Sequence, residues 1–276
     1  MITMNAHDEL KKKGFVVIPN LVSQAQCDRV LENTCALLRH YADSPVLSAE
    51  KPWLNQEFHD YLGTLRKADP KLFGAIYDSA SASVALTGLL VNDEVNQTVA
   101  ELLDVIPAWL TSSGYIQRMD APEDTRNLYD YHQDRPYYPQ NRNGENAVVV
   151  WIPLMDVPLD GGALTTLEGS HVEGYLKTKG EQPTEFHSTQ YHIPDEIIAK
   201  YKPASIPTKA GDGLFMYMTT IHKSGLNHTN LFRFVAIARY HNAVADDFVP
   251  YRVQYKFNKL LTERLAERGE DVSDLL

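Results

Sequence analysis

A histidine and an aspartate lie two positions apart in the segment YDYHQDRPYY, residues 129–138. Side chains at positions i and i+2 of an extended chain share a face, so His132 and Asp134 converge on one point while Gln133 points elsewhere. Such a pair suits a metal ion. A non-haem iron centre of the oxygenase type needs one more histidine and leaves three coordination positions open. Because most isolated His-x-Asp pairs belong to turns or surfaces, further residues must support this interpretation.

The support lies in residues 211–241, GDGLFMYMTTIHKSGLNHTNLFRFVAIARYH. His222 ends an apolar strand, Ser224 follows two residues later, and Arg233 lies in the next strand. If a metal chelates the keto-acid end of 2-oxoglutarate, a guanidinium at position 233 can hold the far carboxylate with two hydrogen bonds. The alternative is an arginine on the surface of the strand, paired with an aspartate. Apolar neighbours on both sides favour a buried Arg233, which then requires a partner.

The elements that must position these residues fall into two parts. Residues up to about 110 have mostly helical periodicity, and short β-rich segments separated by Gly, Pro, Asp and Asn follow. This pattern predicts a β-sandwich or jelly roll with helices on its N-terminal side, and we expect residues 1–276 to form one domain. The polar segment 178–208 is predicted to be an insertion between strands that acts as a lid.

The composition indicates which class of ligand the protein binds and in which cellular compartment it is found. A formal net charge of −10 argues against a nucleic-acid or anionic-membrane binder, so we expect a small-molecule substrate. Cys27 and Cys35 lie on one face of a predicted helix and are expected to be reduced. The N-terminus lacks the pattern of a secretion signal, and no stretch approaches 18 apolar residues. These features together predict a cytoplasmic protein.

The sequence resembles the phytanoyl-CoA dioxygenase family of Fe(II)/2-oxoglutarate oxygenases over nearly its whole length. The similarity is carried by GFVVIPNLVS at the N-terminus, HQD at 132–134, VVVWIPLMDVPLDGGALTTLEGSHVEG at 148–174, and GDGLFMYMTTIHKSGLNHTNLFR at 211–233. The resemblance implies a mainly β fold with flanking helices, the double-stranded β-helix (a cupin-like jelly roll). It also implies that the protein uses Fe(II), 2-oxoglutarate and O2.

The same resemblance implies roles for individual residues. His132, Asp134 and His222 match the iron ligands of the family, and Arg233 with Ser224 matches the clamp for the 2-oxoglutarate carboxylate. The remaining implied co-substrate residues, expected to line that pocket, are Gln133 and Trp151.

Four further residues are candidates for substrate contact. Counting by twos from Arg233 places Arg239 on the same face of its strand, provided that no bulge intervenes. Arg135 and Tyr137 follow the aspartate in a loop expected to overhang the metal, and His171 follows a turn and is a candidate for the mouth of the pocket. The two arginines indicate an anionic or strongly polar substrate. The alternatives are that Arg135 forms a salt bridge with a loop carboxylate and that His171 only hydrogen-bonds a loop.

Hydroxylation of an aliphatic C–H bond, with release of succinate and CO2, is the reaction expected from the resemblance. In related halogenating enzymes a small residue replaces the aspartate and chloride takes its place, so the carboxylate of Asp134 argues for oxygen insertion or for a desaturation or cyclisation. The rival interpretations are a zinc-dependent hydrolase or isomerase using the same three ligands, and a non-catalytic jelly-roll binding module. Neither rival explains Arg233. Sequence patterns say nothing about the oligomeric state.

Overall fold

A computed structural model describes residues 4–42, 44–125, 128–138, 140–141, 143–176 and 191–248. Its helices are α1 (Met4–Lys13), α2 (Gln24–Tyr41), α3 (Gln56–Ala68), α4 (Pro70–Ser81), α5 (Val84–Leu90), α6 (Asp93–Leu103) and α7 (Asp195–Ile198). Its strands are β1 (Phe15–Ile18), β2 (Leu110–Asp120), β3 (Ala147–Pro153), β4 (Leu164–Leu167), β5 (Pro203–Ile206), β6 (Gly213–Tyr217), β7 (His222–Lys223) and β8 (Arg233–Asn242). The predicted division into a helical first part and a β-rich second part is confirmed.

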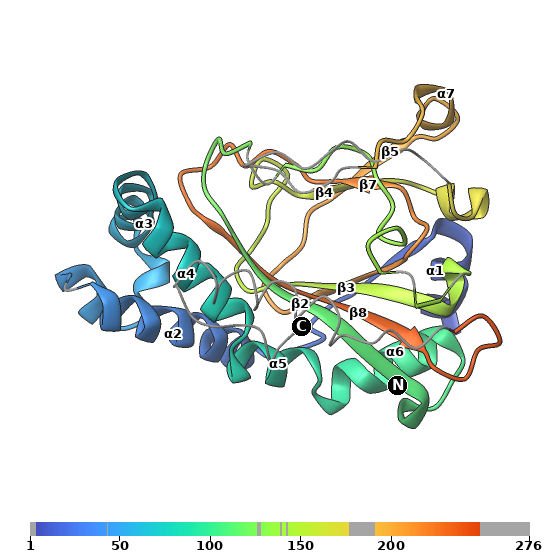
Figure 1. The fold of residues 1–276 in the computed structure, drawn as a ribbon, viewed down its shortest axis with the longest axis horizontal. Helices are drawn as coiled ribbons and strands as arrows, with labels where there is room; N and C mark the ends of the chain where they lie inside the picture. Colours follow the sequence, from blue (N-terminus) through green and yellow to red (C-terminus); the bar gives the residue numbers. More distant parts are fainter. Residues whose placement is uncertain are drawn as a thin grey trace, which may run out of the picture.

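The strands form two antiparallel sheets. The large sheet has the order β1-β6-β3-β8-β2, and the small sheet has the order β5-β4-β7. Figure 1 shows the small sheet above the large one, with helices α2, α4, α5 and α6 on the opposite side of the large sheet. Two facing antiparallel sheets with flanking helices are the predicted jelly-roll architecture.

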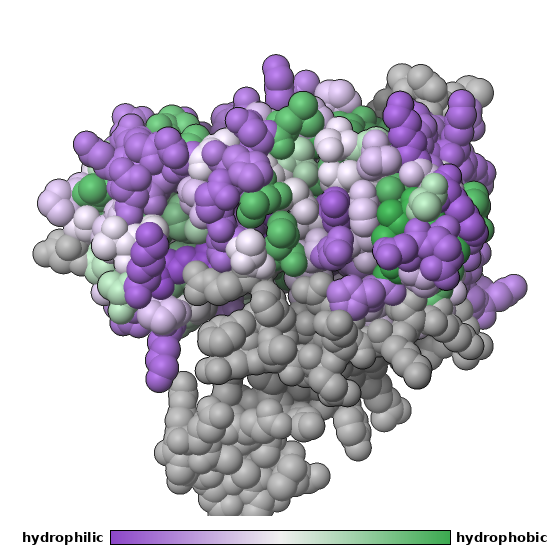
Figure 2. All heavy atoms as spheres, turned by 90° about the horizontal axis from the view of Figure 1, so that it is seen from above, coloured by the Kyte–Doolittle hydropathy of each residue, from purple (hydrophilic) through white to green (hydrophobic). Residues whose placement is uncertain are grey.

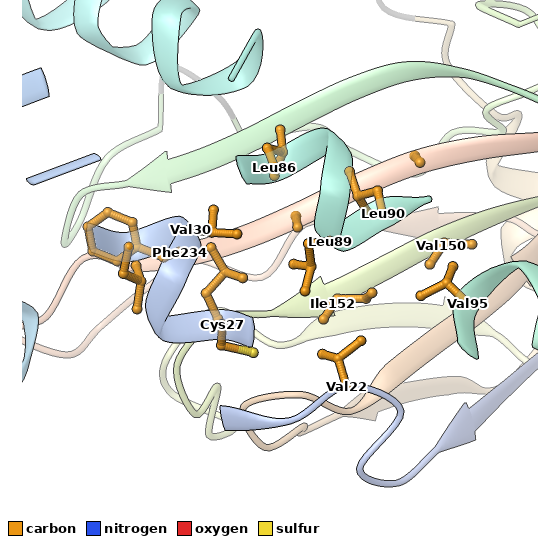
Figure 3. Close-up of a cluster of buried hydrophobic side chains, with 14 of the residues drawn as sticks. Val22, Cys27, Val30, Leu86, Leu89, Leu90, Val95, Val150, Ile152 and Phe234 are labelled. Carbon is orange, nitrogen blue, oxygen red and sulfur yellow. The ribbon is translucent and has the colours of Figure 1, made fainter. Parts of the chain in front are cut away.

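The central strands of the large sheet are buried on both faces, which explains their uninterrupted apolar sequences. On β3, Val148, Val150 and Ile152 belong to the core beneath the helices, whereas Val149 and Trp151 belong to a second core between the sheets. This alternation follows from the two-residue period of a strand. Figure 3 shows the helix-side core, where α2 and α5 bring apolar side chains, among them Cys27, Val30, Leu86, Leu89 and Leu90, against the sheet.

The helices begin where their sequences provide caps. The hydroxyl of Ser23 accepts a hydrogen bond from the backbone N–H of Gln26, and Oε1 of Gln26 accepts one from the backbone N–H of Ser23, which makes a capping box at the start of α2. Cys27 and Cys35 on this helix are both buried free thiols, as predicted. Burial raises the pKa of each thiol to about 12, so both remain protonated near neutral pH.

The segment predicted as a lid is only partly an insertion. Residues 178–190 of the predicted lid 178–208 lie outside the described residues, whereas Pro203–Ile206 forms β5 and pairs with β4 in the small sheet. The prediction was wrong for these four residues. The reason is that the short strand has no strong apolar alternation, and the hydrogen bonds to β4 decide its conformation.

The face seen from above in Figure 2 is mostly hydrophilic, with small groups of apolar side chains separated by polar ones. The larger exposed apolar side chains in the described part of the chain include Leu54, Val84, Leu159 and Val172. Single apolar residues of this kind are ordinary at protein surfaces. Among the described helices, none has the length and apolar character needed to cross a membrane.

Candidate active site

The structure brings His132, Asp134 and His222 together, although 90 positions separate the two histidines. His132 and His222 form an isolated antiparallel β-bridge in which each N–H donates to the C=O of the other, at 2.9 and 3.0 Å. The Oδ1 atom of Asp134 lies 3.5 Å from Nε2 of His132 and 3.7 Å from Nε2 of His222. All three residues are buried, and one potential ligand atom from each lies within 4.8 Å of the others. His132 and Asp134 sit in a bridge and a bend rather than in a regular strand.

Backbone carbonyl groups orient both imidazole rings. Nδ1 of His132 lies 2.7 Å from the carbonyl oxygen of Asp130, and Nδ1 of His222 lies 3.0 Å from that of Thr220. A carbonyl oxygen only accepts hydrogen bonds, so each Nδ1 carries a proton and Nε2 is the ring atom left to bind a metal. Two imidazole Nε2 atoms and one carboxylate oxygen facing a common point are a donor set that fits Fe(II).

Electrostatics keep these groups in the protonation states that a metal requires. Burial lowers the pKa of His222 to about 4, and the neighbouring His132 acts in the same direction. Burial alone would raise the pKa of Asp134, but attraction by Arg239, with contributions from both histidines, outweighs it and holds this pKa below its usual range. At neutral pH the site therefore presents a neutral His222 and an ionised aspartate.

A cavity of about 550 Å³ opens onto these three residues between the two sheets. Its apolar lining comes from five strands and consists of Ile116, Val149, Trp151, Leu164, Met216 and Ile237. Its charged and polar lining, apart from the three residues above, consists of Arg118, Ser224, Arg233 and Arg239. The cavity therefore combines an apolar wall with several fixed cations.

Arg233 lies in a buried cluster with two residues that the sequence analysis missed, Asp120 and Arg118. Its Nε and Nη2 donate to Oδ2 of Asp120 at 3.1 and 2.8 Å, and its Nη1 donates to the carbonyl oxygen of Gly162. Arg118 donates to the other oxygen of Asp120 through Nε and Nη2, at 3.1 and 2.7 Å. Two guanidinium groups and one carboxylate leave this cluster with one net positive charge, which suits a carboxylate ligand.

An available sequence pattern pointed to both missed residues. Ile116, Arg118 and Asp120 alternate along β2, and in the β2–β8 register Asp120 lies directly opposite Arg233. Charged residues at alternate positions of a strand share a face, so they mark a polar surface on that side. The buried ion pair of Arg233 and Asp120 confirms the expectation that Arg233 is buried and has a partner.

Of the remaining co-substrate candidates, Trp151 and Ser224 line the cavity, whereas Gln133 does not. The Gln133 amide instead donates to the carbonyl oxygens of Gly174 and Thr219, each at 2.8 Å, and accepts from the backbone N–H of Leu176. This corrects the expectation that Gln133 lines the pocket. Because it lies between His132 and Asp134, its side chain leaves the backbone in another direction and joins neighbouring loops.

The four substrate candidates divide into two pairs. Tyr137 and Arg239 line the cavity, whereas Arg135 and His171 are not among its lining residues. The guanidinium of Arg135 lies 4.0 Å above the ring of Tyr175, and Nε2 of His171 lies 2.9 Å from the carbonyl oxygen of Lys11. Cation–π stacking and a hydrogen bond to the backbone hold these two side chains away from the cavity lining, and their contact with substrate stays a prediction. For His171 the alternative, hydrogen bonding within the fold, describes the observed contact.

Aromatic side chains form another part of the lining, and of these the sequence pointed to Tyr137 but not to Tyr129 or Tyr191. Tyr129 and Tyr137 meet edge to face with ring centroids 6.4 Å apart, and Tyr137 meets Tyr191 in the same way at 5.1 Å. The Tyr129 ring also lies 5.3 Å from that of His132. These rings border the metal ligands and offer flat, partly polar surfaces to a bound molecule.

Comparisons with known proteins identify the family of the chain. The family profile described as phytanoyl-CoA dioxygenase (PhyH) matches residues 10–235. A search of curated protein sequences gave no match.

Several solved structures share the fold. The epimerase SnoN in complex with Fe3+, alpha ketoglutarate and nogalamycin RO is 18% identical, with a TM-score of 0.59 over 91% of this chain and 87% of that one. The non-heme alpha ketoglutarate dependent carbocyclase SnoK from nogalamycin biosynthesis is 16% identical, with a TM-score of 0.59 over 94% and 90%. The non-heme monooxygenase ThoJ is 17% identical, with a TM-score of 0.57 over 86% and 77%.

Proposed function

The chain belongs to the phytanoyl-CoA dioxygenase family, and on that premise we propose that it hydroxylates an aliphatic C–H bond of a small molecule. As a member of this family the protein is a non-haem iron enzyme that uses 2-oxoglutarate and O2. When bound, the iron activates O2 to oxidise a C–H bond while 2-oxoglutarate is converted to succinate and CO2. The observation that supports the proposal is that the buried ligand set and the Arg233 cluster open into one cavity.

His132, Asp134 and His222 hold the iron in this proposal. The donor set supports these roles because each histidine offers Nε2 and the aspartate offers Oδ1 toward the same point. Three protein ligands leave positions for a chelating keto acid and for O2. The surrounding burial limits the access of water to the reacting groups.

Arg233 and Ser224 bind the far carboxylate of 2-oxoglutarate in this proposal. Both line the cavity, and Asp120 holds the guanidinium of Arg233 in a fixed orientation. Arg118 shares Asp120, so the second cation limits how strongly the aspartate neutralises Arg233. A fixed arginine fork recognises a carboxylate better than a flexible ammonium group does.

The primary substrate is a compact molecule with an apolar, ring-containing body and at least one polar or anionic group. Support for the apolar body comes from the tyrosine rings and aliphatic side chains of the lining. In this proposal 2-oxoglutarate takes up the net positive charge of the Arg118–Asp120–Arg233 cluster, and Arg239 is paired with Asp134. The four tyrosines of the lining can hydrogen-bond a polar group of the substrate through their hydroxyls. The SnoN complex with nogalamycin RO makes nogalamycin and related compounds the class to test first.

Succinate release provides the test of this proposal. The protein is reconstituted anaerobically with Fe(II), then supplied with 2-oxoglutarate, ascorbate and candidate substrates in the presence of 18O2. We expect one substrate class to stimulate succinate formation and to gain one labelled oxygen atom, independently of added chloride. Turnover without 2-oxoglutarate, or activity that follows zinc rather than iron, would support the hydrolase alternative instead. A chlorinated, desaturated or cyclised product would refute hydroxylation while leaving the enzyme class intact.

A further inference from the structure

Arg239 engages one oxygen of Asp134 and leaves the other to face the histidines. Its Nε and Nη2 each lie 2.8 Å from Oδ2 of Asp134. The atom that faces Nε2 of His132 and Nε2 of His222 is Oδ1. The two carboxylate oxygens therefore have separate partners, and Oδ2 must leave a buried charge-assisted contact before it can approach a metal.

Neighbouring groups hold Arg239 in this position. Its Nη1 donates to the carbonyl oxygen of Gly114 at 3.1 Å, and its guanidinium lies 4.3 Å from the centre of the Tyr138 ring. Gly114 has a positive φ of 64° and lies where the β2–β8 register shifts, between Ser113 and Ile116. A Cβ atom at position 114 would lie 2.5 Å from Cε1 of Tyr138. The bulge at Gly114 and the absence of a side chain there make room for the Tyr138 ring to pack against Arg239.

We propose that Arg239 is a positioning residue that restricts Asp134 to bind the metal through Oδ1 alone. The inference rests on the proposed metal centre and deepens it. A carboxylate that bound through both oxygens would occupy one more position on the metal, leaving fewer for 2-oxoglutarate and O2. Losing Arg239 frees Oδ2 and removes the positive charge that competes for it, so both effects favour binding through two oxygens.

Cobalt(II) loading tests this inference without depending on turnover. The visible absorption of bound Co2+ depends on the number and type of its ligands, and its change on adding 2-oxoglutarate measures the affinity for the keto acid. In Arg239→Met we expect an altered spectrum and a Kd for 2-oxoglutarate raised about tenfold, the order found when groups that orient metal ligands are lost. Arg239→Lys keeps the charge with a different donor geometry, so we expect a smaller change in the same direction.

Gly114→Ala disturbs the same arrangement without changing any charge. The new methyl group would displace the Tyr138 ring from the guanidinium, so the Co2+ spectrum should shift as it does in Arg239→Met. Gly88→Ala is the matched control, because Gly88 is exposed on α5 and an added Cβ there meets nothing within 4 Å. Its spectrum and its 2-oxoglutarate affinity should equal those of the wild type.

A failure of this inference can be told apart from a failure of the proposed function. If Arg239→Met has the Co2+ spectrum and the 2-oxoglutarate affinity of the wild type, the inference is wrong. If Arg239→Met does not fold, a wild-type spectrum and affinity in Gly114→Ala would overturn it instead. Circular dichroism and thermal unfolding establish which variants are folded. If the wild-type protein binds no Co2+, or if His132→Ala does not weaken binding, the proposed metal centre itself is wrong.

Discussion

Asp120 and Arg233 face each other across neighbouring strands β2 and β8, with Oδ2 of the aspartate 2.8 Å from Nη2 of the arginine. The second oxygen of Asp120 accepts from Arg118, so one buried carboxylate lies between two guanidinium groups. Burial alone would raise the pKa of Asp120, but Arg118 and Arg233 outweigh that effect and lower it. The cavity thus depends on a carboxylate whose ionised form is favoured by the two arginines.

Asp120→Asn should lower the free energy of unfolding by about 3 kcal/mol, because breaking a buried ion pair leaves uncompensated charge. Urea unfolding at neutral pH measures this change. Asp8→Asn, at an exposed position on α1, is the control and should alter stability by less than about 0.5 kcal/mol. Equal stability of Asp120→Asn and wild type would mean that solvent or rearrangement compensates the two arginines.

Arg233→Lys should raise the KM for 2-oxoglutarate about 30-fold, since one ammonium group cannot reproduce a two-pronged carboxylate contact worth about 2 kcal/mol. The KM for the primary substrate should change far less. Steady-state oxygen consumption with each substrate varied in turn gives both values. Arg39→Lys, at an exposed arginine paired with Glu32, serves as the control. An unchanged requirement for 2-oxoglutarate would remove Arg233 from the clamp.

Alanine at His132, Asp134 or His222 should abolish turnover while the fold persists, because the loss of one of three protein ligands weakens iron binding and disturbs the geometry of the centre. Iron content after anaerobic reconstitution measures iron binding by each variant, and circular dichroism shows whether the fold is kept. His228→Ala, at an exposed histidine bonded to Glu123, should keep full iron content and activity. Any of the three variants that turns over at the wild-type rate is excluded from the ligand set.

Acid should destabilise the metal-free protein through His241. Its pKa is lowered to about 4 because burial, and secondarily Arg239, disfavour the imidazolium. In the unfolded chain the group titrates near pH 6.5, so between about pH 6.5 and 4 the unfolded state binds the extra proton. The stability contributed by neutral His241 is therefore complete above pH 6.5 and is lost as the pH falls toward 4, with a slope of up to about 1.4 kcal/mol per pH unit.

Urea unfolding at several pH values, with a chelator present, measures this slope. His241→Gln should make the pH dependence between 6.5 and 4 shallower, whereas His40→Gln, at an exposed position on α2, should not. An identical slope in wild type and His241→Gln would show that other groups account for the acid sensitivity.

The sequence was sufficient for the features that depend on local periodicity and spacing. The helical first part and the β-rich second part follow from the order of apolar, polar and turn residues. The grouping of His132 with Asp134, and the placing of Arg239 on the Arg233 side of β8, follow from residue spacing alone.

Only the tertiary structure decided which distant residues share a contact. The bridge between His132 and His222, the place of Asp120 between two arginines and the contact of Arg239 with Asp134 all depend on pairings between separate segments. The same is true of Gln133, which binds loop backbone, and of Pro203–Ile206, which pairs with β4. Local patterns show which face a side chain occupies, but strand register and loop packing determine what that face meets.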